Sequence, residues 1–181
     1  MKKKFIIPFV ALAVAFSSCG GGGSQEEGSD STTETTEEVA ETPAAAETVP
    51  GVEDLEISNT LALEGNDQMK FDKDLFRVKA GEEITLTFTN VGELPKESMG
   101  HNVVILKPGV DVPTFGNEAV AASDNDYIPV TSMSSIIAHT KLLGPGEQDE
   151  ITFTLDAPGV YTYICSFPGH FGIMQGKIVA E

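Results

Sequence analysis

Two stretches of strictly alternating side chains constrain the fold of this chain more than any other feature. In EEITLTFTN, the apolar side chains Ile84, Leu86 and Phe88 alternate with threonines, and DEITFTLDAPG repeats the pattern further along the chain. A period of two places one face of a strand against a core and the other face in water. Both stretches therefore predict half-buried β-strands.

Other segments of the chain extend this pattern. FRVKAGEE, HNVVILKPG, VYTYICSF and GKIVAE are further candidate strands, and glycines and prolines lie between them. Only residues 113–123 suggest a helical turn or two. Short strands joined by such turns predict an all-β domain over residues 51–181, a Greek-key β-sandwich or barrel with one short helical insertion.

The N-terminus has the layout of an export signal. MKKKFIIPFVALAVAFSSC begins with three lysines and continues with an apolar run too short to span a membrane comfortably. The run ends at Cys19 and resembles a bacterial lipoprotein signal, which predicts cleavage after residue 18 and lipid modification of Cys19. Two or more acyl chains would anchor the protein firmly. An ordinary signal peptide with an incidental cysteine is the alternative.

Residues 19–50 differ in composition from residues 51–181. After Cys19 they are mostly Gly, Ser, Thr, Glu, Ala and Pro, with acidic but no basic side chains and no aromatic ones, which predicts a disordered tether of roughly 30 Å. Residues 51–181 carry 20 acidic and 8 basic side chains. Binding to nucleic acid needs a cationic surface, so we expect no nucleic-acid partner. We interpret the excess of acidic side chains as a contribution to solubility, in preference to an acidic docking site.

The segment ICSFPGHFGIMQGK contains three side chains that bind soft metal ions: Cys165, His170 and Met174. On one strand, residues five and nine positions apart would not converge. The intervening SFPGHFG contains one proline and two glycines, so the chain can turn there. If Cys19 is acylated, Cys165 is the only remaining thiol, and a disulfide cannot explain it.

A thiolate, an imidazole and a thioether suit copper better than magnesium, calcium or manganese. A blue-copper site also needs a second imidazole, and SMGHNVV offers His101. His101, Cys165 and His170 would form a trigonal plane, with the Met174 sulfur and the Gly100 carbonyl as weak axial contacts.

Other interpretations of these residues are weaker. A buried cysteine is commonly a small apolar side chain, and a methionine commonly fills a gap in a core. A Cys–His hydrolase would need an orienting third residue and oxyanion donors, for which the chain shows no motif. A zinc site is chemically feasible, but a methionine ligand argues against one.

The chain resembles the azurins, which are blue copper proteins of the cupredoxin superfamily. The resemblance covers residues 53–181 and rests on LEGNDQMKFD, GELPKESMGHN, IIAHTKLLGPGEQDEITF and CSFPGHFGIMQGK. The spacing Cys-x4-His-x3-Met is similar to that of azurin rather than plastocyanin, pseudoazurin or amicyanin. The resemblance implies one bound copper that cycles between Cu(II) and Cu(I), and hence a one-electron carrier.

The resemblance also implies roles for residues around the copper. Asn102 would tie the two ligand-bearing segments together, and the backbone near Phe167 would donate toward the Cys165 sulfur. The electron would leave through an exposed edge of His170, inside an apolar patch that touches partner proteins. The patch positions that match are Met69, Leu94, Met99, Phe167 and Ile173, and Phe171 adds a large ring where small residues are common.

The chain departs from the azurin pattern at several positions. The usual disulfide is missing, and no tryptophan is present, with Val103 beside the first ligand histidine. Asn90 stands where some azurins carry a titrating histidine, which predicts weak coupling of reduction potential to pH between 5 and 8. We expect no copper role for His139.

Taken together, these features predict a monomeric, lipid-anchored periplasmic carrier in a bacterial respiratory chain. Its partners would be transient: a c-type cytochrome, a terminal oxidase or another redox protein. Copper storage, delivery or resistance is the alternative, but such proteins usually expose Met- or His-rich sites that this chain lacks. An oxidase or nitrite reductase places histidine directly after the copper cysteine, where this chain has Ser166. We therefore expect no enzyme activity.

Overall fold

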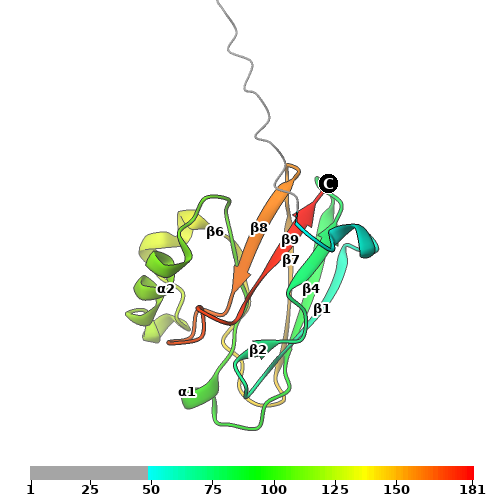
Figure 1. Ribbon diagram of the computed structural model, residues 1–181. Helices are drawn as coiled ribbons and strands as arrows, with labels where there is room; N and C mark the ends of the chain where they lie inside the picture. The colour runs from blue at the N-terminus through cyan, green and yellow to red at the C-terminus, as the bar shows by residue number, and fades with distance from the viewer. Residues whose placement is uncertain (1–48) are drawn as a thin grey trace, which may run out of the picture. The chain divides into compact units, whose positions relative to one another are not determined.

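The computed structural model describes residues 49–181, which form two β-sheets with short helices at one side (Figure 1). The predicted signal peptide, Cys19 and nearly all of the predicted tether lie outside the described residues. Within 49–181, no helix combines the length and apolar character needed to cross a membrane.

The first sheet brings together the two alternating segments that predicted the fold. Its strand order is β2-β1-β4-β7. β4 pairs antiparallel with β7, where Ile84 lies opposite Phe153, and parallel with β1, where Leu86 lies opposite Leu61. The apolar side chains of each strand thus share the face that is buried. The bounds are β1 (Thr60–Asn66), β2 (Lys70–Phe71), β4 (Glu83–Asn90) and β7 (Gln148–Thr154).

The second sheet has the order β3-β9-β8-β5-β6. β3 and β9 are parallel, and the other neighbours are antiparallel. The chain passes from one sheet to the other several times, so the predicted all-β sandwich fold is confirmed. The sequence did not predict β1, β2 or β6. The bounds are β3 (Leu75–Val78), β5 (Val104–Leu106), β6 (Ile136–His139), β8 (Gly159–Ile164) and β9 (Gln175–Ala180).

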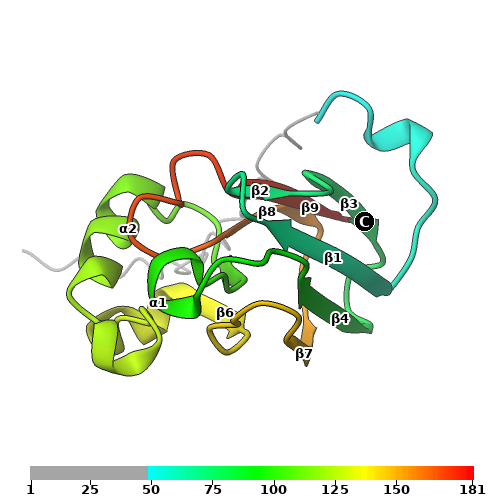
Figure 2. The same cartoon turned by 90° about the horizontal axis from the view of Figure 1, so that it is seen from below.

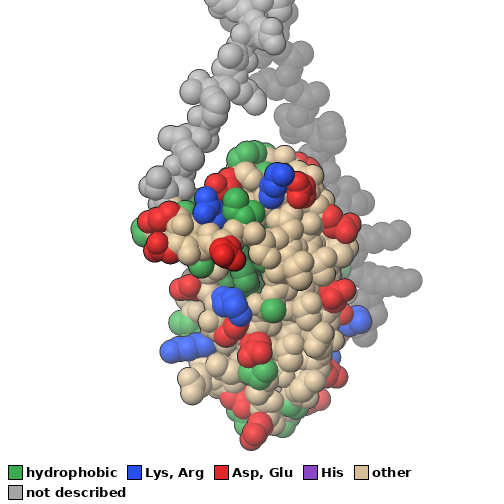
Figure 3. Space-filling view, turned by 90° about the vertical axis from the view of Figure 1, so that its right-hand side faces the viewer, with side chains coloured by type: hydrophobic (Ala, Val, Ile, Leu, Met, Phe, Trp, Pro, Cys, Tyr) green, Lys and Arg blue, Asp and Glu red, His purple; other side chains and the backbone are tan. Residues whose placement is uncertain are grey.

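The main core lies between the sheets and is made of the inward side chains of both. Apolar area removed from water stabilises such a core by about 25 cal/mol per Å². On the outer face in Figure 3, acidic and basic side chains are interspersed, as expected for a solvated surface. The buried core residues include Leu61, Leu63, Val78, Ile84, Leu86, Phe88, Ile105, Phe153, Leu155, Tyr163 and Ile178.

The helical insertion, residues 112–135, is longer than the predicted turn or two. Its main helix is α2 (Val112–Val120), whose start is capped because the Asp111 carboxylate accepts the Thr114 N–H at 3.0 Å. Two 3-10 turns follow, Ser123–Asn125 and Val130–Ser135. Two further short helical elements lie outside the insertion: Val52–Asp54 and α1 (Lys96–Met99). In Figures 1 and 2, α2 lies beside the five-stranded sheet.

The two ends of the sandwich differ. The ligand loop, residues 165–174, joins β8 to β9 at one end. At the other end of β9, Ala180 pairs with Val78 of β3, beside the strap, which is the segment of residues 51–59 that leads into β1. Six strand residues at about 3.3 Å each separate the two ends by about 20 Å. Figure 1 shows the ligand loop and the C-terminus at opposite ends of β9.

Candidate metal centre

Three predicted ligands converge in the structure. The side chains of His101, Cys165 and His170 are buried, and their ligand atoms lie within 4.8 Å of one another. The Cys165 Sγ lies 3.6 Å from Nδ1 of His170 and 3.9 Å from Nδ1 of His101. Both imidazoles therefore face the sulfur with the same ring nitrogen.

His101 is held just before β5 by an isolated β-bridge to Leu143. The His101 N–H donates to the Leu143 carbonyl at 3.1 Å, and the Leu143 N–H donates back at 2.7 Å. Cys165 directly follows β8, whose last residue Ile164 pairs with Val104 of β5. The antiparallel pairing of β5 with β8 thus brings together two ligands that are 64 residues apart in the sequence.

The ligand loop closes on itself through backbone hydrogen bonds. The Cys165 N–H donates to the Met174 carbonyl at 2.9 Å, and the Met174 N–H donates to the His170 carbonyl at 2.8 Å. A third bond runs from the His170 N–H to the Phe167 carbonyl at 3.0 Å. Gly169 adopts a positive φ of 84°, which only glycine enters without strain. The predicted turn between the ligands is therefore confirmed.

Met174 is fully buried in the same pocket. It packs in one cluster with Cys165, Phe167 and Leu142. The ligand Cys165 therefore lies in a cluster of buried apolar side chains that includes the Met174 thioether.

A hydrogen bond sets the tautomer of His101. Its Nε2 lies 3.0 Å from the Asn66 carbonyl. Because a carbonyl only accepts, Nε2 carries the proton, and the lone pair of Nδ1 faces the Cys165 sulfur. Orienting partners of this kind are typical of metal-binding histidines.

Burial controls the protonation of all three side chains. It lowers the pKa of His101, and it lowers the pKa of His170 to about 4 with a smaller contribution from the neighbouring His101. It raises the pKa of the Cys165 thiol to about 12, against two backbone N–H groups that stabilise the thiolate. The imidazoles are thus neutral and ready to bind a metal, and the thiolate needs a positive partner.

The geometry fits a single metal ion. Metal–nitrogen and metal–sulfur bonds of about 2.0 and 2.3 Å, at a trigonal angle, place the two ligand atoms about 3.7 Å apart. The observed separations of 3.6 and 3.9 Å bracket this value. Two imidazoles and one thiolate form the trigonal set that copper electron-transfer sites use.

Asn102 links three segments beside the pocket. Its side-chain Nδ2 donates to the Asp126 carbonyl at 3.0 Å and to the Ser166 Oγ at 2.8 Å, and its Oδ1 accepts the Ser166 N–H at 2.8 Å. The backbone N–H groups of Asn102 and Phe167 both face the Cys165 sulfur. The sequence pointed to Asn102 and Phe167 but not to Asp126, whose contact uses only a backbone carbonyl.

Gly100 is buried just before the first ligand histidine. A Cβ at this position would lie 2.6 Å from the Lys96 carbonyl oxygen and 3.0 Å from the Leu142 side chain. The close approach of two segments therefore requires glycine here. The axial roles predicted for the Gly100 carbonyl and the Met174 sulfur stay predictions.

The predicted apolar patch is only partly exposed. Leu94 and Ile173 are 44% and 59% exposed, and Met69 and Met99 are half-buried. Phe167 is only 6% exposed, so its placement on the surface was wrong. Its ring packs between Tyr127 and His170, at centroid distances of 5.0 and 4.7 Å.

Two further expectations about exposure need correction. Phe171 is half-buried and packs against α2 instead of lying on the open patch. His170 is only 3% exposed, so the predicted exposed edge is almost covered. The position of Phe171 follows from a helical insertion that is larger than the sequence suggested, because its Gly116 lies against the Phe171 ring. The ring of Phe167, itself packed on Tyr127 of the insertion, lies against His170.

Asn90, a departure from the azurin pattern, and His139, for which no copper role was predicted, lie at defined positions in the fold. Asn90 is buried; its Nδ2 donates to the Leu143 carbonyl and its Oδ1 accepts the Gly92 N–H. His139 is half-buried on β6, outside the cluster of converging ligands, and its Nδ1 lies 3.1 Å from the Thr140 carbonyl.

Comparison with known proteins agrees with the fold and the site. The family model described as "Copper binding proteins, plastocyanin/azurin family" matches residues 58–181. The chain belongs to this family of copper-binding proteins. The family and the three converging side chains support a site for one copper ion.

Two relatives illustrate the similarity. Outer membrane protein H.8 of Neisseria meningitidis serogroup B is 43% identical over 121 residues, which are 64% of this chain and 64% of that protein. The match thus spans just under two thirds of the relative's length. Azurin of Alcaligenes faecalis is 38% identical over 122 residues, which are 65% of this chain and 94% of that azurin.

Two solved structures share the fold. Auracyanin from Roseiflexus castenholzii, in a dithionite-reduced form, matches with a TM-score of 0.64 and 36% identity over 70% of this chain and 99% of its own. An azurin from Methylomonas sp. strain J matches with a TM-score of 0.61 and 33% identity over 67% of this chain and 97% of its own.

Proposed function

We propose that the protein is a one-electron carrier that uses a mononuclear blue copper site. The observation that carries this proposal is the buried trigonal set of Nδ1 of His101, Sγ of Cys165 and Nδ1 of His170. Copper in such a set supplies one reversible electron, Cu(II) to Cu(I) and back. The relatives named azurin and auracyanin support the same function.

The surrounding residues support electron transfer because they hold the ligands still. The Asn66 carbonyl fixes the His101 ring, and Asn102 joins the segments that carry His101 and Cys165. The backbone N–H groups toward the sulfur stabilise its negative charge. In this proposal the Met174 sulfur and the Gly100 carbonyl are the weak axial contacts.

A carrier of this kind does no chemistry on a bound substrate, and we propose that the protein is not an enzyme. The position after Cys165 is Ser166, whose N–H and hydroxyl both bond to Asn102. This residue thus serves the pocket and offers no ligand toward a second metal. Storage or delivery of copper is the alternative proposal. The enclosure of all three ligands favours electron transfer over rapid metal exchange.

We further propose the setting predicted from the sequence: a signal peptide over 1–18, a lipidated Cys19 with an acidic tether over 19–50, and the copper domain over 51–181. The relative named outer membrane protein H.8 supports a location at a bacterial envelope. The domain would act in the periplasm as a monomer in a respiratory chain. Its transient partners would be a c-type cytochrome or a terminal oxidase.

We propose that partners dock on a surface that includes the exposed side chains Leu94 and Ile173 and the half-buried Met69 and Met99. A contiguous exposed apolar patch usually marks a contact site, and this proposal takes the four side chains to form one. Ile173→Lys and Leu94→Lys should slow electron exchange with a purified cytochrome and leave the copper spectrum unchanged. Unchanged rates in both variants would place the contact elsewhere.

Addition of Cu(II) to the purified protein tests the function directly. We expect an intense blue colour and a narrow parallel hyperfine splitting in the electron paramagnetic resonance spectrum. Both features should be lost in Cys165→Ala, and Zn²⁺ should give a colourless protein. A colourless copper complex of the wild-type protein, or a blue one of Cys165→Ala, would contradict the proposal.

A further inference from the structure

Phe171 follows the copper ligand His170 directly, and the structure gives it a packing partner that its sequence position did not suggest. The side chain is half-buried against the cluster that contains Val104, Phe115 and Ile164. This cluster lies between the five-stranded sheet and α2 and is separate from the main core. A residue of the ligand loop therefore takes part in the packing of the helical insertion.

The ring of Phe171 lies directly over Gly116, a buried residue inside α2. A Cβ added at Gly116 would lie 2.4 Å from Cδ1, 2.5 Å from Cγ and 2.7 Å from Cδ2 of Phe171. Glycine inside a helix is less favourable than alanine because it loses more conformational entropy on folding. The close approach of the ring gives a physical reason for glycine at this position. Both Figures 1 and 2 show the chain between β8 and β9 running toward α2.

The ligand loop needs such an anchor where Phe171 lies. Gly169 and Gly172 flank the pair His170–Phe171, and a Cβ at either glycine would meet no atom within 4 Å. Glycine carries no side chain, so neither residue can fasten the loop tip to a neighbouring element by packing. The Phe171 ring is the side chain between them that reaches the helical insertion.

We infer that the contact of Phe171 with Gly116 positions the ligand His170 for copper by fastening the ligand loop to α2. Phe171 is a positioning residue, because it acts through the backbone of His170 and not on the metal. This inference rests on the copper function proposed above. It accounts for a large ring in the loop and for a glycine in the helix opposite.

A double-mutant cycle in the full-length copper protein tests the inference. Phe171→Ala removes the ring, and Gly116→Ala pushes a methyl group into it. Each should speed the loss of copper to a competing chelator about tenfold or more, the usual cost of losing an orienting contact near a metal. The double variant should be no worse than Phe171→Ala, because the methyl group then occupies the space that the ring has left. Phe171→Leu should recover part of the wild-type rate.

Phe153→Ala is the matched control, because it removes the same atoms from a buried position of the main core. If that variant does not fold, Phe153→Leu is compared with Phe171→Leu. Both controls should lower the melting temperature of the metal-free protein without changing copper loss or the hyperfine splitting. The Phe171 and Gly116 variants should change all three.

The inference is overturned if the Phe171 and Gly116 variants lower only the melting temperature, or if Gly116→Ala acts equally with and without Phe171. These outcomes are distinct from a failure of the proposed function, which would show as a wild-type protein that forms no blue copper complex at all.

Discussion

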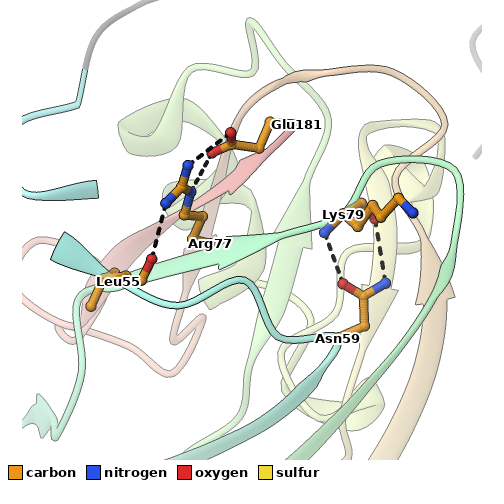
Figure 4. A network of polar contacts seen from close by, with 5 residues as sticks. All are labelled: Leu55, Asn59, Arg77, Lys79 and Glu181. Carbon is orange, nitrogen blue, oxygen red and sulfur yellow. Dashed lines mark hydrogen bonds and ion pairs between the residues drawn. The ribbon is translucent and has the colours of Figure 1, made fainter. Parts of the chain in front are cut away.

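Two asparagines at opposite ends of the sandwich make the same kind of contact in different surroundings. At the metal end, Asn102 bonds to the Asp126 carbonyl and to both polar groups of Ser166, and it is fully buried. At the strap end, Asn59 bonds to the carbonyls of Lys79 and Glu83 and accepts the Lys79 N–H, in contact with water. Figure 4 shows the two bonds between Asn59 and Lys79.

Other polar contacts at the two ends differ in the same way, because they are exposed at the strap end and buried at the metal end. At the strap end, Arg77 forms a two-bond ion pair with Glu181, at 2.5 and 3.0 Å, and donates to the Leu55 carbonyl at 3.1 Å (Figure 4). Water can replace exposed bonds of this kind, so they contribute little to stability. At the metal end, a lost partner leaves a buried polar group unsatisfied, which is costly. The metal end is thus the sensitive one.

Strained backbone is concentrated at the metal end as well. Among the described residues, the non-glycine positions with positive φ are Met69, Asp126 and Tyr127. Met69 and Tyr127 pack against the cluster that contains Cys165, and the Asp126 carbonyl accepts a bond from Asn102. Strain of this kind persists where the surrounding contacts determine the conformation, and it is typical of functional sites.

Copper loading should give the largest change at the metal end. A ligand present at about a thousand times its dissociation constant stabilises a folded protein by about 4 kcal/mol. For a domain of this size that corresponds to a rise in melting temperature of about 10 °C. Scanning calorimetry of the metal-free and copper-loaded proteins measures it. Equal melting temperatures would mean that the three ligands do not hold the metal in the folded state.

Asn102→Ala should have the next largest effect. It leaves the buried Ser166 N–H and Asp126 carbonyl without partners, at a cost of about 2–4 kcal/mol in the free energy of unfolding. Copper affinity should fall about tenfold or more because the two ligand segments are no longer tied together. Urea denaturation and chelator competition measure the two quantities.

Asn59→Ala is the matched variant at the strap end, since it removes the same side chain, which there makes three hydrogen bonds against four at Asn102. Its partners are reached by water, so the cost should stay near about 0.5–1 kcal/mol, with no change in copper affinity. Equal destabilisation by the two variants would show that burial does not distinguish the two ends.

The sequence alone predicted most of the strands that carry a side-chain pattern, although β1, whose buried Leu61 and Leu63 alternate with exposed residues, was missed. β4 and β7 were predicted because Ile84 and Phe153 alternate with polar residues and face the same core. β2 and β6 were not predicted, because β2 has two residues and β6 buries only Ile136 fully, so neither shows a period of two. The three converging ligands were predicted from residue type and spacing.

What the sequence could not predict depends on backbone groups and on distant packing. The Asn66 carbonyl that orients His101 has no sequence signature, because every residue has a carbonyl. The sequence does not indicate whether an aromatic side chain in a loop, such as Phe167 or Phe171, is exposed or buried. The contact between Phe171 and Gly116 appears only when α2 is placed beside the ligand loop.

A smaller effect is expected for Arg77→Ala at the strap end. The Arg77 guanidinium holds the pKa of the Glu181 carboxyl below its ordinary value of 4.5. A carboxyl whose pKa is lower in the folded than in the unfolded protein stabilises the fold at pH values above its unfolded pKa. This stabilisation is lost as the pH falls through the pKa that the carboxyl has in the folded protein. The melting temperature of Arg77→Ala should therefore lie at most about 3 °C below wild type near pH 7.

The difference between Arg77→Ala and wild type should then shrink below pH 4.5 and disappear in more acidic solution. Melting curves between pH 3 and 7 measure it, and Lys79→Ala, which breaks the neighbouring exposed pair with Glu82, is the control for loss of one positive charge. A difference that grows as the pH falls would contradict the assignment of the pair. The copper spectrum should be the same in both variants.

The smallest effect is expected at Asn90, the buried amide near the metal end. The Asn90 side chain donates to the Leu143 carbonyl and accepts the Gly92 N–H. Leu143 in turn forms the β-bridge with the ligand His101. An amide does not titrate, so these contacts stay the same across the physiological range. The reduction potential should therefore change little between pH 5 and 8, far less than the roughly 59 mV per unit of a fully proton-coupled one-electron couple.

The variant Asn90→His tests this prediction, because an imidazole titrates near neutral pH and would replace the amide that contacts Leu143 and Gly92. The variant should acquire a pH-dependent potential that the wild type lacks, measured by redox titration of the blue absorption. If the wild-type protein already shows a full slope over this range, a different titrating group is coupled to the copper. The metal end would then respond to pH through a group other than the Asn90 amide.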